Sequence, residues 1–173
     1  MTMEVRRIVV ANDENGASVV ISDERLPAAS RGIGKNVTGS ELWSTDTMPV
    51  DNAPGADPAQ RKGYIKVHND YNYVGSGQGT AFRITEWGPG HPRFTHRTQT
   101  TDYDVVLQGE IDLELDSGEV VHLKTGDVVI MRGCTHTWMN RSTKPAVTAF
   151  ILIDAAPVEV ASGMLRPIFP NTG

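Results

Sequence analysis

The chain has 173 residues, of which 39% are hydrophobic and 21% charged, as expected for one globular domain with a hydrophobic core. It carries 16 Lys and Arg against 21 Asp and Glu, a formal net charge of -5, and no basic run. Neither nucleic acid nor a membrane is therefore expected as a partner. The single cysteine, Cys134, excludes an internal disulfide, and the apolar stretch at 8–11 is too short for a signal peptide. We expect a cytoplasmic protein.

The N-terminal part combines one hairpin with a long irregular region. β-branched residues at 5–11 and 17–22 flank a polar stretch with turn chemistry at 12–16, which predicts a hairpin. Residues 26–63 are rich in Pro, Gly, Ser and Asp, with one extended segment at 40–48. Such long irregular regions are typical of lids and binding loops.

The second half contains short β-like runs separated by turn signals, and no convincing helical periodicity. Residues 111–115 alternate apolar and polar side chains before the Asp116-Ser117-Gly118 turn, which predicts a hairpin with one buried face. The runs span 80–87, 102–107, 110–115, 119–123, 127–131, 136–140 and 146–154. This pattern predicts an all-β barrel or sandwich. Residues 158–173 are interpreted as a short helix or as an arm that packs on the barrel or on a neighbouring subunit.

Two segments, 96–110 and 126–140, together resemble the two conserved motifs of the cupin superfamily. The first family motif reads His-x-His, three or four residues, Glu, six residues, Gly. The second reads Gly-Asp, a hydrophobic run, a turn, then His and Asn, and a hairpin lies between the two. The resemblance implies one cupin-type antiparallel β-barrel, a jelly roll or double-stranded β-helix, over 1–173. Within it, 1–79 would form the N-terminal hairpin and lid region, 80–154 the motif-bearing core, and 155–173 a C-terminal arm.

The same resemblance implies a site for one divalent metal ion. His96, Asp102 and His136 fall at ligand positions of the family, with Asp102 seven residues before Gly109. The chain departs from the family at Thr98, where a second histidine is expected, at Asp102 in place of Glu, and in the shorter second motif. The remaining two-His, one-carboxylate set suits Fe, Mn, Zn or Ni. The alternative is a metal-free site.

Without a metal, these residues still form an acid/base site, because a histidine beside a carboxylate transfers protons near neutral pH. Asp104 lies two residues after Asp102, so on a strand both side chains point to the same face. Two neighbouring carboxyl groups can raise the pKa of one of them. In the alternative interpretation, a bulge turns Asp104 to solvent.

Further candidates line the same predicted cavity. An inward Arg83 would bind an anionic substrate group, whereas an outward Arg83 would lie on an exposed strand face. The substrate-binding candidates are Arg83, Trp43, Trp87, Thr98 and Trp138, and the tryptophans have packing in the core as their alternative. Cys134 shares the face of His136 and is interpreted as a buried, inert thiol.

The other three histidines are weaker candidates. His91, in a Gly/Pro-rich loop, is either a replacement ligand over the barrel mouth or a structural residue. His68 and His122 are expected at the surface.

Three functions remain open at this point. The first is a small-molecule lyase, a dehydratase or decarboxylase, with His96, Asp102, His136 and Asp104 as its catalytic groups. The second is a metal-dependent dioxygenase or isomerase, and the third a non-catalytic protein that binds small molecules. All three imply a small organic partner, and the terminal segments resemble those with which small cupins form homodimers. The fold alone does not choose between them.

Overall fold

The structure is a computed structural model that describes residues 3–45, 47–53 and 79–170. Every regular element in these residues is a strand. The strands are β1 (Glu4–Asn12), β2 (Ser18–Pro27), β3 (Ala29–Ser30), β4 (Val37–Thr45), β5 (Thr80–Trp87), β6 (Thr100–Gln108), β7 (Glu110–Leu115), β8 (Val120–Lys124), β9 (Val128–Arg132), β10 (His136–Met139), β11 (Ala146–Asp154), β12 (Glu159–Val160) and β13 (Gly163–Met164). No helix in the described part of the chain is long and apolar enough to cross a lipid bilayer.

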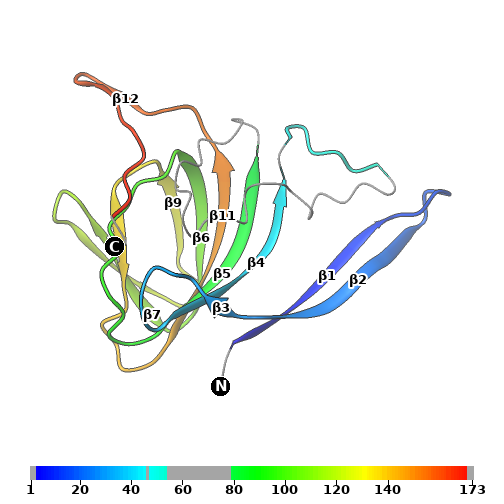
Figure 1. Cartoon of the computed structure of the whole chain (residues 1–173), viewed down its shortest axis with the longest axis horizontal. Helices are drawn as coiled ribbons and strands as arrows, with labels where there is room; N and C mark the ends of the chain where they lie inside the picture. The colour runs from blue at the N-terminus through cyan, green and yellow to red at the C-terminus, as the bar shows by residue number, and fades with distance from the viewer. Residues whose placement is uncertain (1–2, 46, 54–78, 171–173) are drawn as a thin grey trace.

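Two antiparallel sheets form the body of the molecule (Figure 1). The larger sheet has the order β3-β4-β5-β11-β6-β9, and the smaller has the order β10-β7-β8. Within the described residues the sheets do not close into one continuous hydrogen-bonded barrel. The all-β, antiparallel architecture predicted from the sequence is confirmed. That residues 1–173 form a single domain stays a prediction.

The core lies between the two sheets because side chains alternate between the faces of a strand. On the larger sheet, Phe150 and Leu152 of β11 are each 8% exposed, and they meet Leu113 and Trp138 from the smaller sheet in one hydrophobic cluster. The outer face is open, and Tyr103 on β6 is 45% exposed there. The alternation thus decides which polar side chains of β5 and β6 are enclosed with the core.

The predicted N-terminal hairpin is confirmed: β1 and β2 pair antiparallel and project from the body as an arm (Figure 1). Ion pairs such as Arg6 with Asp23 join the two strands. Ile8, Val10, Val20 and Ile21 are all about half exposed or more. A two-stranded hairpin has little stability alone. Its exposed apolar side chains would therefore suit packing against a second subunit. The homodimer stays a prediction.

The C-terminal segment forms the short β12–β13 hairpin and then an extended stretch, so the helix alternative is wrong for the described residues. Arg97 fixes this stretch: its main chain pairs with that of Ile168, and its guanidinium donates to the carbonyl of Arg166. The segment is therefore an arm packed on its own chain. Of the predicted irregular region, 54–63 lies outside the described residues, as does His68.

Candidate functional site

His96 and His136 form a pair of imidazoles at the edge of the smaller sheet, where His136 begins β10, and their ring planes are tilted by 53°. Their main chains make a two-residue antiparallel bridge, with N–H to carbonyl distances of 3.0 and 2.9 Å. Directly opposed residues in such a bridge point to the same side, and the ring centres lie 4.4 Å apart. His136 is 3% exposed and His96 partly exposed.

Each imidazole makes the same hydrogen bond to the backbone two residues before it. Nδ1 of His96 lies 3.3 Å from the carbonyl oxygen of Phe94, and Nδ1 of His136 lies 3.1 Å from that of Cys134. A carbonyl only accepts, so each neutral ring carries its hydrogen on Nδ1 and its lone pair on Nε2. Burial lowers the pKa of His96 to about 3 and that of His136 to about 4, helped at His96 by the neighbouring His136. Both rings are therefore neutral at pH 7.

Asp102 and Asp104 lie on the inner face of β6, so the interpretation in which a bulge turns Asp104 to solvent is wrong. They are 5% and 1% exposed. Neither oxygen of Asp104, nor Oδ1 of Asp102, has a hydrogen-bond partner among the described residues. Burial raises the pKa of Asp102 to about 6. Burial together with the charge of Asp102 raises the pKa of Asp104 to about 8, so Asp104 is largely protonated at pH 7.

This arrangement predicts that Asp104→Asn stabilises the protein at alkaline pH. Suppose that a carboxyl has a higher pKa in the folded than in the unfolded chain. Its contribution to the stability of the fold is then fully present below the unfolded pKa and is lost as the pH rises through the folded pKa. For Asp104 this window runs from 3.8 to about 8. Because one pKa unit corresponds to about 1.4 kcal/mol, the variant should gain a few kcal/mol over wild type by pH 9. Urea unfolding at pH 4, 6, 7.5 and 9 measures the gain.

The control for this prediction is the exposed residue Asp116. Asp116→Asn removes the same charge without removing a buried carboxyl, so its stability should follow that of wild type over the series. Parallel stability curves for Asp104→Asn and wild type would show that Asp104 is not protonated by burial.

Arg83 points inward from β5, as the sequence interpretation with an anionic substrate requires. Its side chain is 11% exposed, and its Nε lies 3.4 Å from Oε2 of Glu41 without a hydrogen bond. Glu41 on β4 is also 3.6 Å from the guanidinium of Arg31. Phe150 pairs with Asp104 and packs against Trp138, which in turn packs against His136, so the histidine pair and the carboxyl pair face the same interior. Sequence reasoning missed Glu41.

Two tryptophans take inward positions, in agreement with their packing alternative. Trp87 is 5% exposed and its indole N–H donates to Oγ1 of Thr148 at 2.8 Å. Trp138 is 3% exposed and packs edge-on to Phe150, with ring centres 5.4 Å apart. Trp138 also packs edge-on to His136, at 6.5 Å. It is therefore an aromatic wall beside the histidine pair as well as a core residue.

Trp43 differs from its prediction, and Thr98 has a local structural contact. A register shift between Glu41 and Trp43 places Trp43 opposite the outward-facing Phe82, and the guanidinium of Arg7 lies 5.8 Å from its ring centre. The prediction that Trp43 lines the cavity is wrong. Thr98 accepts a hydrogen bond from the hydroxyl of Thr100 at 2.8 Å, so it supports the start of β6, and its predicted contact with substrate is untested.

The remaining candidates have structural roles. Both nitrogens of His91 are engaged: Nδ1 lies 2.9 Å from the carbonyl of Pro92, and Nε2 accepts the N–H of Asn140 at 3.0 Å. The replacement-ligand interpretation of His91 is therefore wrong. Cys134 is half-buried, and burial raises the pKa of its thiol. His122 is at the surface, 2.6 Å from Asp112.

The predicted metal ligands do not converge into one centre. No group of three or more His, Cys, Asp or Glu side chains within 3–45, 47–53 and 79–170 is arranged to hold a metal ion. Asp102 does not join the two imidazoles in such a group, so this arrangement does not fit a three-ligand site. The divalent ion stays a prediction, and no chemical step is derived through it.

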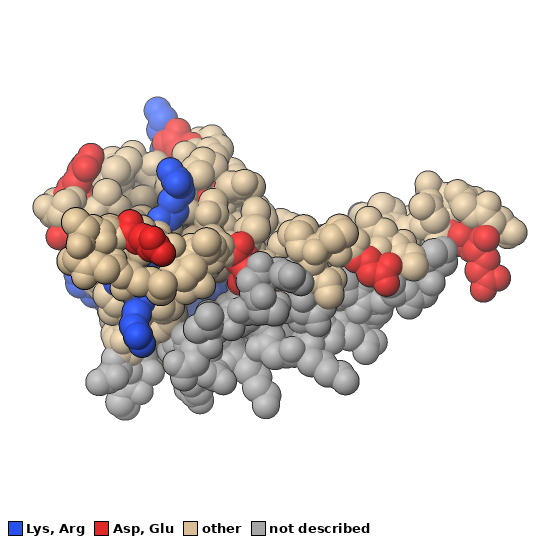
Figure 2. Space-filling view, turned by 90° about the horizontal axis from the view of Figure 1, so that it is seen from above, with Lys and Arg blue, Asp and Glu red and all other residues tan. Residues whose placement is uncertain are grey.

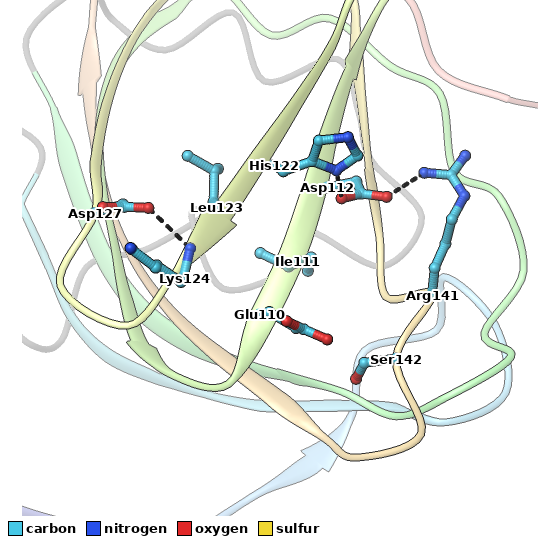
Figure 3. A pocket seen from close by; sticks show the side chains of 9 residues that line it. All are labelled: Glu110, Ile111, Asp112, His122, Leu123, Lys124, Asp127, Arg141 and Ser142. Atoms are coloured by element: carbon cyan, nitrogen blue, oxygen red, sulfur yellow. Dashed lines mark hydrogen bonds and ion pairs between the residues drawn. The ribbon is translucent and has the colours of Figure 1, made fainter.

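A surface pocket of about 530 Å³ lies apart from these residues (Figure 3). It is lined by Glu110, Ile111, Asp112, His122, Leu123, Lys124, Asp127, Arg141 and Ser142. Asp112 contacts both His122 and Arg141, and Arg141 also reaches Glu114. The nearby charges are thus largely satisfied by one another. On the face of the body shown in Figure 2, acidic and basic side chains are interspersed. The pocket is therefore separate from the interior site, because His96, His136, Asp102 and Asp104 do not line it.

Comparisons with known proteins agree with this architecture. The Cupin domain family matches residues 83–153. Phomopsin biosynthesis cluster protein C' of Diaporthe leptostromiformis is 36% identical over 162 residues, 92% of this chain and 83% of that protein. The cupin-domain-containing oxidoreductase srdD of Neurospora crassa is 27% identical over 92% of this chain and 80% of its own.

A solved structure, a putative ethanolamine utilization protein Q from Salmonella typhimurium, aligns with a TM-score of 0.49 and 14% identity over 89% of this chain and 99% of its own. The family match covers both segments that carry the histidines and carboxyls, and the fungal relatives extend the similarity over nearly the whole chain. The chain is therefore a member of the cupin domain family, related to fungal biosynthesis cluster proteins and cupin-domain oxidoreductases.

Proposed function

We propose that this protein is a lyase that removes water or carbon dioxide from a small organic molecule by proton transfer next to a carbonyl group. One observation carries the proposal: a pair of neutral imidazoles shares the interior between the sheets with two buried carboxyls, of which Asp104 has no hydrogen-bond partner among the described residues. Such pairs of groups with divergent pKa values are typical of acid/base sites.

The hydrogen-bond pattern assigns the two roles. Since Nδ1–H of His136 is held by a carbonyl, Nε2 presents its lone pair and accepts a proton from the carbon next to the substrate carbonyl. Protonated Asp104 donates its proton to the leaving hydroxyl, which departs as water while the carbon–carbon double bond forms. The imidazolium then returns a proton to the carboxylate through solvent, which restores the site.

The low pKa of the histidine pair fits a base that substrate activates. An anionic group next to an imidazole raises its pKa. The charge of Arg83 disfavours the charged form of His96, and an anionic substrate would offset that charge. Binding therefore raises the basicity of the pair where the proton is taken. The biosynthetic context named for the relatives also favours a small-molecule substrate.

Deuterium exchange tests this proposal. The protein is incubated in D₂O with a panel of small hydroxy- and keto-carboxylic acids, and proton NMR follows the hydrogen next to the carbonyl group. Wild type should exchange or eliminate at least one member, the double variant His96→Gln/His136→Gln none, and the surface variant His122→Gln as many as wild type. The lyase assignment fails if wild type leaves every compound unchanged, or if the double variant matches it.

The second candidate is a metal-dependent oxidoreductase, favoured by the name of the Neurospora crassa relative. Within the described residues, the Nε2 atoms of the histidine pair make no hydrogen bond, while each Nδ1–H is held by a carbonyl. This adds to the second candidate, because Nδ1–H bonded to a carbonyl is the usual support of a metal-bound histidine. Elemental analysis of protein purified without added metal separates the candidates. Stoichiometric iron together with oxygen consumption would favour the oxidoreductase over the lyase.

A further inference from the structure

One row of inward side chains crosses four neighbouring strands of the larger sheet. Glu41 on β4 is opposite Arg83 on β5, Arg83 is opposite Phe150 on β11, and Phe150 is opposite Asp104 on β6. Adjacent strands lie about 4.8 Å apart, so the main chains at Arg83 and Asp104 are separated by roughly 10 Å. Phe150, between them, provides an aromatic floor that Trp138 extends at 5.4 Å.

Both ends of this row hold buried polar atoms whose partners are incomplete. Among the described residues, Glu41 is the sole carboxylate within ion-pair distance of Arg83, and Nε of Arg83 makes no hydrogen bond. At the other end, both oxygens of Asp104 lack a hydrogen-bond partner within the same residues, although the side chain is only 1% exposed. Buried polar groups are rarely left without a partner in folded proteins.

Strand pairing positions the cationic end. Glu41 pairs with Arg83 in the regular part of β4, on the inner face, and the register shift that follows turns Trp43 to the outer face. Glu41, with 15% of its side chain exposed, then lies between the guanidinium groups of Arg31 and Arg83. A guanidinium anchored on one side by a carboxylate keeps its remaining N–H groups for a second, planar anion. Glu41 is therefore a positioning residue for Arg83.

We infer that the interior selects a small hydroxy-carboxylate, with its carboxylate on Arg83, its hydroxyl on Asp104 and its carbon frame on Phe150. The inference rests on the proposed function, for which it names the substrate class. A molecule that has the carboxylate but no hydroxyl would leave Asp104 without a hydrogen-bond partner. A molecule that has the hydroxyl but no carboxylate would leave Arg83 without its second anion. Losing such a buried hydrogen bond corresponds to an affinity loss of about tenfold.

Three matched probes test the assignment: 3-hydroxybenzoate, benzoate and 3-hydroxybenzamide, with dissociation constants from calorimetry or NMR titration. Wild type should bind 3-hydroxybenzoate about tenfold more tightly than either of the others. Arg83→Met should abolish the preference for the carboxylate over the amide but keep the preference for the hydroxyl. Asp104→Ala should do the reverse. Arg132→Met, the same change at an exposed position of β9, should leave all three affinities unchanged.

The double variant Glu41→Gln/Arg83→Met removes both partners of the ion pair and covers the case in which Arg83→Met alone fails to fold. The inference is overturned if wild type binds none of the probes at millimolar concentration, binds all three equally, or keeps its carboxylate preference without Arg83. These probes report binding alone. If the predicted ranking of affinities holds but no compound exchanges deuterium, only the lyase proposal is rejected. If deuterium exchange is seen but the ranking fails, only this substrate class is rejected.

Discussion

Replacing His136 by alanine is expected to lower turnover of a lyase substrate about 10²- to 10⁴-fold. The imidazole is 3% exposed, its orientation is fixed by the carbonyl of Cys134, and its ring lies 4.4 Å from that of His96. Removing it takes away the positioned Nε2 and a neighbour that lowers the pKa of His96. The measurement is kcat and KM for whichever hydroxy-carboxylate exchanges fastest.

His136→Asn separates chemistry from folding. The asparagine amide can still donate to the carbonyl of Cys134 but offers no atom in place of Nε2, so it should lose as much activity as alanine while unfolding closer to wild type. His96→Ala should cost a similar factor, and the double variant little more, since residues that act as a unit are non-additive. If His136→Asn keeps more than a tenth of wild-type kcat, His136 is not the base.

The fold could be predicted because the chain marks its turns and alternates its faces. Gly109, Gly118 and Gly126 all adopt positive φ values between strands, and turn residues with such freedom were the signals that divided the second half into runs. The pairing of β7 with β8 follows from the alternation at 111–115 and the turn at 116–118. The C-terminal segment lacked such a pattern, so helix and arm could not be distinguished before its contacts with Arg97 were known.

The candidate site was predictable wherever strand periodicity was unbroken. Asp102 and Asp104 share a face on β6, as a period of two requires, and both are buried. On β4 the period breaks, because the register shift after Glu41 flips every following side chain to the other face. Unbroken alternation would place Trp43 on the same inner face as Glu41, which is why the prediction for Trp43 is wrong. A bulge of this kind leaves no mark in residue type, so only the strand pairing reveals it.

The interior position of Arg83 was open for a related reason. A single arginine on a strand carries no signal for its own face, since its apolar neighbours Phe82 and Ile84 suit the inner face equally well. In the structure Phe82 is 37% exposed, while Arg83 shares the inner face with Ala81, which is 0% exposed. The charged group was enclosed because the small Ala81 and the partner Glu41 leave it room and a counter-charge.

Gly109→Ala is expected to destabilise the fold by about 3 kcal/mol or more, from two separate causes. Gly109 joins β6 to β7 with φ at +78°, a conformation that costs residues with a Cβ about 1–2 kcal/mol. A Cβ there would also lie 2.9 Å from the carbonyl oxygen of Pro145 and 3.1 Å from Cα of Ala146. Ala146 is 0% exposed, so β11 would have to shift. Urea unfolding at pH 7 measures the loss.

Gly126→Ala isolates the backbone cause. Gly126 has φ at +94°, but a Cβ there would meet no atom within 4 Å, so this variant should lose only the conformational cost of about 1–2 kcal/mol. The difference between the two variants then measures the contact of the β6–β7 turn with the start of β11. That contact matters to the site, because β11 pairs with the strand that carries Asp102 and Asp104. Equal losses in the two variants would mean that the turn does not brace β11.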